Sequence, residues 1–354
     1  MGGRVRLERH SSFADLDSEW DALAEASRNV FATREWLEAW WRHFGDGHEL
    51  ALTTARDQDG RLVAALPLYL WGARGLRVLR FLGHGPGDLL GPVAAPADLH
   101  AAQGALRSAL GDAALRWHVF LGEQLLGAES WSTALGADVV RTTGFPIVRF
   151  APGETWDDVL ARQSGGWRAN VRRRARRLAD GHDVRYRLVD GGEGLQAEID
   201  VLYDLHRRRW TNVDSPFTGP REAFHREFAE LAARRGWLRL WFLDVDDIPV
   251  ATTYGWRFGG VEHYYQAGRD EAWSRYAVGR LLVLHALRSA LEDGLSEFRF
   301  LRGDESYKYD YATEDPKLDI VARGRGPLGA TLLRAGLAVY RSRLRELLRR
   351  AVGA

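Results

Sequence analysis

The stretch "LRLWFLDVDDIPVATTYGWRFGGVEHYYQAG", residues 238–268, decides the fold. It holds three apolar runs, which are separated by Asp246-Asp247 and by Gly259-Gly260. Pairs of Gly, Asn or Asp residues between such runs are typical of two-residue loops that join antiparallel strands. The stretch therefore predicts three consecutive antiparallel strands connected by tight turns.

A helix and a fourth strand follow this meander. In "GRLLVLHALRSALEDG", residues 279–294, leucines fall on one face of a helix, and Gly294 suits the left-handed position beyond the helix end. The run "EFRFL", residues 297–301, then predicts a strand that leads into a polar loop. Two further helices are expected upstream of the meander, at 192–209 and 221–235.

The first half of the chain repeats this order. Apolar and aromatic residues at helical spacing over 17–44 precede the strand candidates 49–57, 61–71 and 76–83, a helix at 98–110 and a strand at 116–122. We expect an α+β protein of two tandem domains, each with a mostly antiparallel central sheet flanked by helices. The expected ranges are 1–148 and 149–325, with a C-terminal helix over 326–354.

Composition narrows the function classes. The 354 residues include 49 basic and 48 acidic residues, so the net charge of +1 gives no global attraction to nucleic acid or anionic lipid. The absence of cysteine excludes disulfides, thiolate metal sites and a cysteine nucleophile, and scattered histidines predict no metal site. Without a signal-peptide pattern or an apolar run of membrane-spanning length, we expect a cytoplasmic protein.

Several segments carry a family resemblance. The order of meander, glycine-containing helix start, helix and strand resembles the GNAT acyltransferase fold. The segments 31–45, 205–210, 276–287 and "FRFLRGDESYKYDYA" (298–312) resemble the tandem-GNAT family that includes cellulose-biosynthesis acetyltransferases and, more distantly, Fem-type peptidyltransferases.

The resemblance implies an enzymatic activity and a different role for each of the two domains. It implies an N-acetyltransferase that moves an acetyl or longer acyl group from acyl-coenzyme A to an amine or hydroxyl of a sugar, a polysaccharide or another cell-envelope precursor. The second domain is then catalytic, whereas the first is degenerate and shapes the acceptor site. No metal cofactor is implied.

The helix that begins near residue 278 is the expected donor site. The first turn of a helix exposes backbone N–H groups that bind phosphate, and Gly279 permits close approach. GNAT enzymes that use coenzyme A usually carry two glycines in this turn, whereas this chain has one, so an ordinary helix start remains the alternative. The donor-binding candidates are Arg275, Val278, Gly279, Arg280 and Leu281.

The loop after the last strand is the expected catalytic segment. Acyl transfer needs a base for the nucleophile and donors for the thioester oxygen. The resemblance implies that Asp304, Glu305, Tyr307 and Lys308 line the active site. The alternative is a charged turn with a structural salt bridge, because Lys308 lies three residues after Glu305.

Further candidates lie on other segments. His206 is a candidate base, and Arg209 and Trp210 beside it are candidates for acceptor binding, although helix packing explains the same residues. The resemblance implies an acceptor-binding loop over 81–91, which makes Asp88 a candidate.

A run of six arginines within 168–177 is the strongest charge feature. Arg168, Arg172 and Arg176 align on one face of a helix, which suits phosphate groups of coenzyme A, of a sugar-diphosphate acceptor or of a charged tRNA. A solvated basic helix is the alternative. With a nearly neutral chain, nucleic acid is not an expected partner unless tRNA is the donor.

The C-terminal segment 325–350 predicts a basic amphipathic helix. Its apolar stripe consists of Leu333, Leu337, Tyr340, Leu344 and Leu347. Such a helix binds a membrane surface, a partner such as a synthase, or its own domain. Two other functions also remain open. The single-glycine turn and the arginine helix favour a Fem-type transferase that uses aminoacyl-tRNA, and a non-catalytic accessory protein of exopolysaccharide synthesis is the third interpretation.

Overall fold

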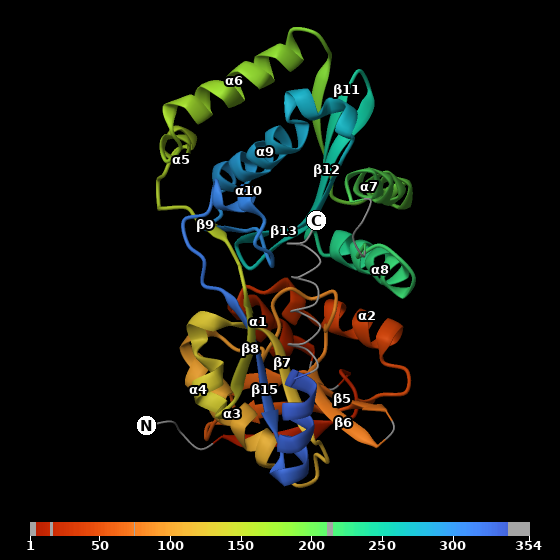
Figure 1. The fold of residues 1–354 in the computed structure, drawn as a ribbon, viewed down its shortest axis with the longest axis vertical. Helices are drawn as coiled ribbons and strands as arrows, with labels where there is room; N and C mark the ends of the chain where they lie inside the picture. The colour runs from red at the N-terminus through yellow and green to blue at the C-terminus, as the bar shows by residue number, and fades with distance from the viewer. Residues whose placement is uncertain (1–4, 15–16, 74, 211–214, 339–354) are drawn as a thin grey trace. The chain divides into compact units, whose positions relative to one another are not determined.

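The computed structural model describes residues 5–14, 17–73, 75–210 and 215–338 (Figure 1). The chain divides into two compact units. The first consists of Met1–Ser27, Phe31–Thr143 and Lys317–Ala354, and the second of Arg28–Val30 and Gly144–Pro316. Each unit is a mixed α+β structure, as the sequence predicts.

A six-stranded sheet forms the centre of the second unit. Its strand order is β10-β11-β12-β13-β14-β9, and only β13 and β14 pair in parallel. The strands are β9 (Ile147–Arg149), β10 (Val184–Val189), β11 (Leu238–Val245), β12 (Ile248–Phe258), β13 (Val261–Arg269) and β14 (Glu297–Arg299).

Tight turns connect the three central strands. Asp246 and Asp247 have φ angles of 50° and 63°, and Gly259 and Gly260 have φ angles of 57° and 70°. Positive φ at both central residues is the geometry of a two-residue hairpin loop, and it matches the twist of the flanking strands. The predicted meander is therefore confirmed.

Helices cover both faces of this sheet (Figure 1). Helices α7 (Leu195–Arg209) and α8 (Pro220–Arg234) pack on one face, and α9 (Val278–Glu292) packs on the other. Helices α5 (Trp156–Ala161) and α6 (Gly165–Ala179) share the apolar core beneath α9, and the short α10 (Ser306–Tyr309) follows β14. Gly294 has φ 75° just beyond α9, as predicted.

The first unit contains two sheets. A six-stranded sheet has the order β2-β5-β6-β7-β15-β8, and a three-stranded sheet has the order β1-β3-β4. The strands are β1 (Arg6–His10), β2 (Glu49–Leu50), β3 (Leu52–Arg56), β4 (Leu62–Leu66), β5 (Leu68–Ala73), β6 (Leu76–Phe81), β7 (Val119–Leu126), β8 (Asp138–Thr143) and β15 (Leu318–Gly324). Helices α1 (Asp17–Ser27), α2 (Arg34–Phe44), α3 (Leu99–Gly111) and α4 (Trp131–Leu135) complete the unit.

Two expectations differ from the structure. The helical pattern over 17–44 is two helices, because the Thr33 hydroxyl accepts a hydrogen bond from the Trp36 N–H and starts α2 anew. The expected domain ranges 1–148 and 149–325 differ at both ends. Strand β9 lies across the first boundary in the sheet of the second unit, whereas β15 pairs with β7 and β8 of the first unit.

The expected C-terminal helix is described only in part. Residues 326–338 are helical, with Leu333 and Leu337 half-buried, whereas Tyr340, Leu344 and Leu347 lie outside the described residues. Within the described ranges, no helix combines the length and the apolar character that crossing a membrane requires.

Candidate active site

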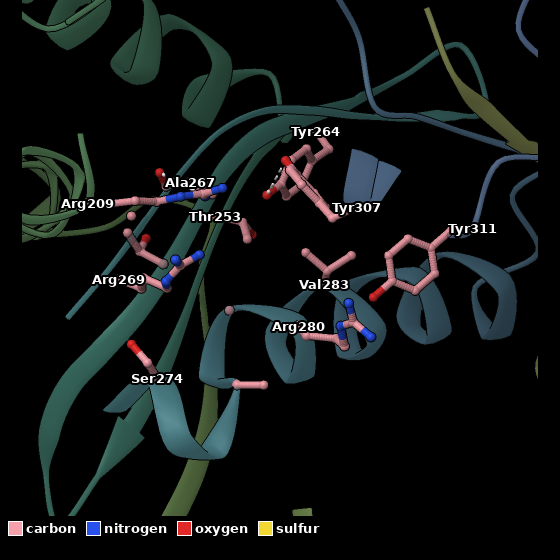
Figure 2. Close-up of a pocket in the computed structure, with 14 residues that line it drawn as sticks. Arg209, Thr253, Tyr264, Ala267, Arg269, Ser274, Arg280, Val283, Tyr307 and Tyr311 are labelled. Atoms are coloured by element: carbon pink, nitrogen blue, oxygen red, sulfur yellow. Dashed lines mark hydrogen bonds between the residues drawn. The ribbon is translucent and has the colours of Figure 1, made fainter. Parts of the chain in front are cut away.

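A cavity of about 260 Å³ lies in the second unit, beside the C-terminal half of β13 and the start of α9 (Figure 2). Residues of α7, β12, β13, α9, α10 and the segment between β13 and α9 meet there, together with Tyr311 just after α10. Its lining residues are Arg209, Thr252, Thr253, Tyr264, Ala267, Gly268, Arg269, Ser274, Ala277, Gly279, Arg280, Val283, Tyr307 and Tyr311.

The cavity lies where two parallel strands separate. The pairing of β13 with β14 covers only Val261–His263 and Glu297–Arg299. Between Tyr254 and Gly255 of β12 the register shifts, which leaves Tyr265 as an extra residue on β13. Such a bulge changes which side chains face each side of the sheet. Tyr264 before the bulge and Ala267 and Arg269 after it line the cavity, whereas the Tyr265 ring lies 5.3 Å from that of His225 on α8.

Beyond the point of separation, one edge of β13 faces away from β12. The Ala267 carbonyl accepts hydrogen bonds from the Trp210 indole at 3.3 Å and from Arg209 at 3.5 Å. In an antiparallel ladder the N–H and C=O of one residue point to the same side. The Ala267 N–H therefore also points to the edge that β14 no longer covers.

The start of α9 has the features of an anion site. Ala277 is in the left-handed conformation with φ 58°, and its carbonyl accepts the N–H groups of Arg280 and Leu281 at 2.9 and 3.1 Å. The N–H groups of Val278 and Gly279 come before the first intrahelical hydrogen bond of α9. The helix therefore supplies no carbonyl acceptor for them. Gly279 lines the cavity, which brings the positive end of a fifteen-residue helix to it.

Arginines set the charge of the cavity. Arg269 pairs with Glu271 at 2.7 Å and Arg280 pairs with Asp310 at 3.0 Å, whereas Arg209 has no carboxylate partner within the described residues. The lining residues include three arginines and no carboxylate or imidazole. The cavity is therefore suited to anions and lacks a conventional general base.

Three tyrosines supply hydroxyl groups. The Tyr307 hydroxyl donates to the Tyr264 hydroxyl at 3.4 Å (Figure 2). Burial, together with the neighbouring Tyr264, raises the pKa of Tyr307, and burial also raises the pKa of Tyr311. Both phenols therefore keep their protons at neutral pH and are able to donate them.

The predicted catalytic loop lies only partly at the cavity. Tyr307 lines it, but Lys308 is buried with its Nζ 2.9 Å from a Glu305 carboxylate oxygen and 2.8 Å from the Arg302 carbonyl. Asp304 accepts a hydrogen bond from the Gly144 N–H at 2.8 Å. Asp304, Glu305 and Lys308 thus tie the loop together, which matches the structural salt bridge that the sequence left as the alternative.

His206 also lies outside the cavity lining. Its Nε2 is 3.3 Å from the Gln266 amide oxygen and its Nδ1 is 3.4 Å from the Ser215 hydroxyl. Burial lowers the pKa of His206 to about 4. The imidazole is therefore a neutral packing group between α7 and β13, and the candidate residues of this segment that reach the cavity region are Arg209 and Trp210.

The predicted donor-binding residues fall into two groups. Gly279 and Arg280 line the cavity. Val278 and Leu281 are buried in the core beneath α9, and the Arg275 guanidinium lies 4.7 Å from the Tyr276 ring centre. Helical periodicity explains the division within α9, because Val278 and Leu281 are three residues apart and share the buried face, whereas Gly279 and Arg280 between them face the cavity.

The remaining candidates do not line the cavity. Arg168 is half-exposed and Arg172 exposed on α6, and Asp88 is buried in the first unit. Sequence reasoning missed several lining residues that the structure brings together, namely Thr253, Tyr264, Ala267, Arg269, Ser274 and Tyr311. The signal for Tyr264, Ala267 and Arg269 lay in "YYQAGRD" (264–270), but the bulge that orients this segment has no sequence signature here. Among the described residues, no cluster of three His, Asp or Glu side chains forms a metal site.

Comparisons with known proteins agree with the fold of the second unit. Residues 166–309 match the family model of the acetyltransferase (GNAT) domain. The crystal structure of FemX superposes with a TM-score of 0.64 at 10% identity, covering 93% of this chain and 99% of that one. The C-terminal domain of a putative lysylphosphatidylglycerol synthetase from Agrobacterium fabrum superposes with a TM-score of 0.55 at 11% identity, covering 92% and 97%.

A conserved protein of unknown function from Bacteroides thetaiotaomicron gives a TM-score of 0.54 at 12% identity, covering 90% of this chain and 99% of that one. No curated protein matches the chain significantly. At these identities the structural likenesses show the fold alone. The matching domain model covers most of the second unit and includes the segment from α6 to α10, so this unit is a GNAT acyltransferase domain.

Proposed function

We propose that the second unit transfers an acetyl or longer acyl group from acyl-coenzyme A to an amine or hydroxyl of a sugar, polysaccharide or other cell-envelope precursor. The observation that carries the donor assignment is the start of α9. Its first-turn N–H groups reach the cavity at Gly279, beside Arg269 and Arg280. A helix start with adjacent arginines suits the pyrophosphate of coenzyme A.

The edge of β13 suits the thioester. A carbonyl placed along this edge accepts a hydrogen bond from the Ala267 N–H, which points away from β12. As the acceptor nitrogen or oxygen attacks the carbonyl carbon, negative charge develops on the carbonyl oxygen, and this N–H stabilises it. The tetrahedral intermediate then collapses and its carbon–sulfur bond breaks.

Tyr307 is our candidate for the proton donor to the departing sulfur. Its phenol is neutral and half-buried, and its hydroxyl donates a hydrogen bond to the Tyr264 hydroxyl. The proton that the acceptor loses restores the phenol, so the products are an amide or ester and the free thiol. Because no lining residue is a carboxylate or imidazole, an amine acceptor must arrive unprotonated.

A Fem-type transfer from aminoacyl-tRNA remains the second candidate. Helix α6 carries six arginines and no acidic residue over Gly165–Ala179, and most of these arginines are exposed. The Arg174 guanidinium contacts the Arg275 carbonyl at 3.5 Å, so α6 lies against the segment that precedes α9. A basic surface next to the donor site suits a polynucleotide as well as the 3′-phosphate of coenzyme A.

The proposed class of acceptor suggests what the C-terminal helix binds. Leu328 is 60% exposed within the helical residues 326–338. We propose that this helix contacts a membrane surface or an exopolysaccharide or cellulose synthase, close to where the acceptor is made.

Thiol release tests the proposed reaction. The chain has no cysteine, so a thiol-reactive chromogenic reagent reports free coenzyme A without protein background. With acetyl-coenzyme A and a set of amino-sugar acceptors that includes phosphorylated ones, we expect turnover of at least one acceptor, which rises with pH up to the pKa of its amine. Tyr307→Phe should lower kcat by about 100-fold, whereas Tyr309→Phe, in the same turn but not lining the cavity, should change it little. If the protein used aminoacyl-tRNA as a donor but no acyl-coenzyme A, the Fem-type transfer would replace the proposed reaction.

A further inference from the structure

The guanidinium of Arg209 lies in the wall of the cavity, and its charge is not used by the reaction described above. Arg209 is the last residue of α7 and is half-buried. Figure 2 shows its side chain extending toward the hydroxyl groups of Tyr264 and Tyr307. The arginine therefore sits beside the tyrosine that we assign to proton donation.

Arg209 is held by weak partners. Its Nη1 lies 3.5 Å from the Ala267 carbonyl, and its guanidinium carbon is 4.5 Å from the Trp210 ring centre and 5.7 Å from the Tyr307 ring centre. No carboxylate pairs with it among the residues that the structure describes. The two rings position the guanidinium plane without neutralising its charge.

Several half-buried arginines of the second unit pair with carboxylates. Arg187 lies 2.6 Å from Glu198 and 3.1 Å from Asp244. Arg257 pairs with Glu262 and Asp293, and within the cavity Arg269 and Arg280 each pair with one carboxylate. Withdrawing a guanidinium from water without an anion is costly, so a ligand anion at Arg209 would be stabilised strongly.

The position of Arg209 indicates which ligand carries this anion. The phosphates of the donor are assigned to the start of α9 on one face of the sheet, whereas Arg209 comes from α7, which packs on the opposite face (Figure 1). The acceptor must reach the thioester from the side that the donor does not occupy. An anion beside Arg209 therefore belongs to the acceptor.

We propose that Arg209 binds a carboxylate or phosphate of the acceptor, so that the substrate is an acidic amine or alcohol rather than a neutral sugar. The proposal rests on the proposed function, because it needs the donor at α9. A buried charged group that is left unpaired by a neutral analogue discriminates against that analogue. Neutral amino sugars should accordingly be poor acceptors.

The test uses product analogues that differ only in the anion. The wild-type protein is saturated with coenzyme A and titrated calorimetrically with N-acetylglycine and N-acetylglycinamide, then with N-acetylglucosamine 6-phosphate and N-acetylglucosamine. The first pair tests a carboxylate and the second a phosphate. We expect the anionic member of at least one pair to bind about 10-fold or more tightly than its neutral partner.

Three variants complete the test. Arg209→Met should abolish the preference for the anion, Arg209→Lys should retain part of it, and the exposed neighbour Arg207→Met, which removes the same charge from α7, should leave it intact. Failure of coenzyme A to bind the wild type would refute the donor assignment instead. Three results would overturn the proposal. The wild type could show no preference for the anion, or Arg209→Met could keep the preference. In the third case, Arg209→Met would lose the preference together with its affinity for coenzyme A.

Discussion

The imidazole of His206 makes the second unit sensitive to acid. Burial lowers its pKa to about 4, against about 6.5 in the unfolded chain. Between these two pKa values, the imidazole of His206 binds a proton in the unfolded state but not in the folded state. The stabilisation is complete above pH 6.5 and is lost as the pH falls toward 4, and a shift of this size corresponds to about 3 kcal/mol.

We predict that His206→Gln removes this part of the pH dependence. Between pH 7 and 4, the unfolding free energy of the wild type should fall by about 3 kcal/mol more than that of the variant. Denaturant unfolding at a series of pH values measures the difference, and an NMR titration of the His206 ring gives its pKa directly. Parallel stability curves, or an imidazole that titrates near 6.5, would show that His206 is solvated.

At the residue scale, the sequence predicts contacts between neighbouring side chains better than it predicts which side chains line the cavity. The spacing of Glu305 and Lys308 correctly places the ammonium beside the carboxylate, and the pair is 2.9 Å apart. Only the fold shows that this ammonium also binds the Arg302 carbonyl and is buried away from the cavity. Residue type and spacing fix local pairing, whereas exposure to a cavity depends on distant elements.

At the scale of elements, the contact between α7 and β13 orients the cavity wall. A Cβ on Gly268 would lie 2.5 Å from the His206 nitrogen and 2.5 Å from the Leu205 carbonyl carbon, both backbone atoms of α7. Backbone cannot move aside as a side chain does. The glycine thus permits α7 to approach the strand closely enough for Arg209 to line the cavity.

We predict that Gly268→Ala destabilises the second unit by about 1–3 kcal/mol, because it forces α7 away from β13. Gly181→Ala is a matched control in the same unit, since its Cβ would meet nothing closer than the Arg177 carbonyl at 3.8 Å. Thermal unfolding of both variants measures the effect. Equal stability of the two variants would mean that α7 is not in tight contact with Gly268.

The elements themselves were largely predictable, whereas their local irregularities were not. Turn residues at Asp246-Asp247 and Gly259-Gly260 fix the meander, and leucine spacing fixes α9. The extra residue Tyr265 reverses the alternation that a regular strand would give, so sequence periodicity misassigns which β13 side chains face α9. The cavity lining depends on this bulge.

At the scale of the whole molecule, the first unit is completed by a distant part of the chain. Strand β15 lies between β7 and β8 in the sheet, although it begins 192 residues after the end of β7 and 175 residues after the end of β8. Sequence order could not show this, because an apolar run after the loop that follows β14 fits either unit. The family model matches residues 166–309 of the second unit, whereas β15 belongs to the sheet of the first unit.

We predict different outcomes for two truncations. A chain that ends after Pro316 lacks β15 and should lose the cooperative unfolding of the first unit, since β8 loses its pairing partner. A chain that ends after Arg325 keeps β15 complete and should retain it with a smaller loss of stability. Thermal unfolding followed by circular dichroism distinguishes them. Identical unfolding of the first unit in both chains would contradict the strand order.

The most direct measurement of the central claim is calorimetric titration with acetyl-coenzyme A and with a long-chain acyl-coenzyme A. We expect micromolar binding by the wild type. Gly279→Ala should weaken binding, because its Cβ would take up space at which the glycine lets a phosphate approach, and Gly279→Glu, which also places a negative charge at the start of α9, should abolish binding. No binding by the wild type, or undiminished binding by Gly279→Glu, would contradict a coenzyme A site at this helix.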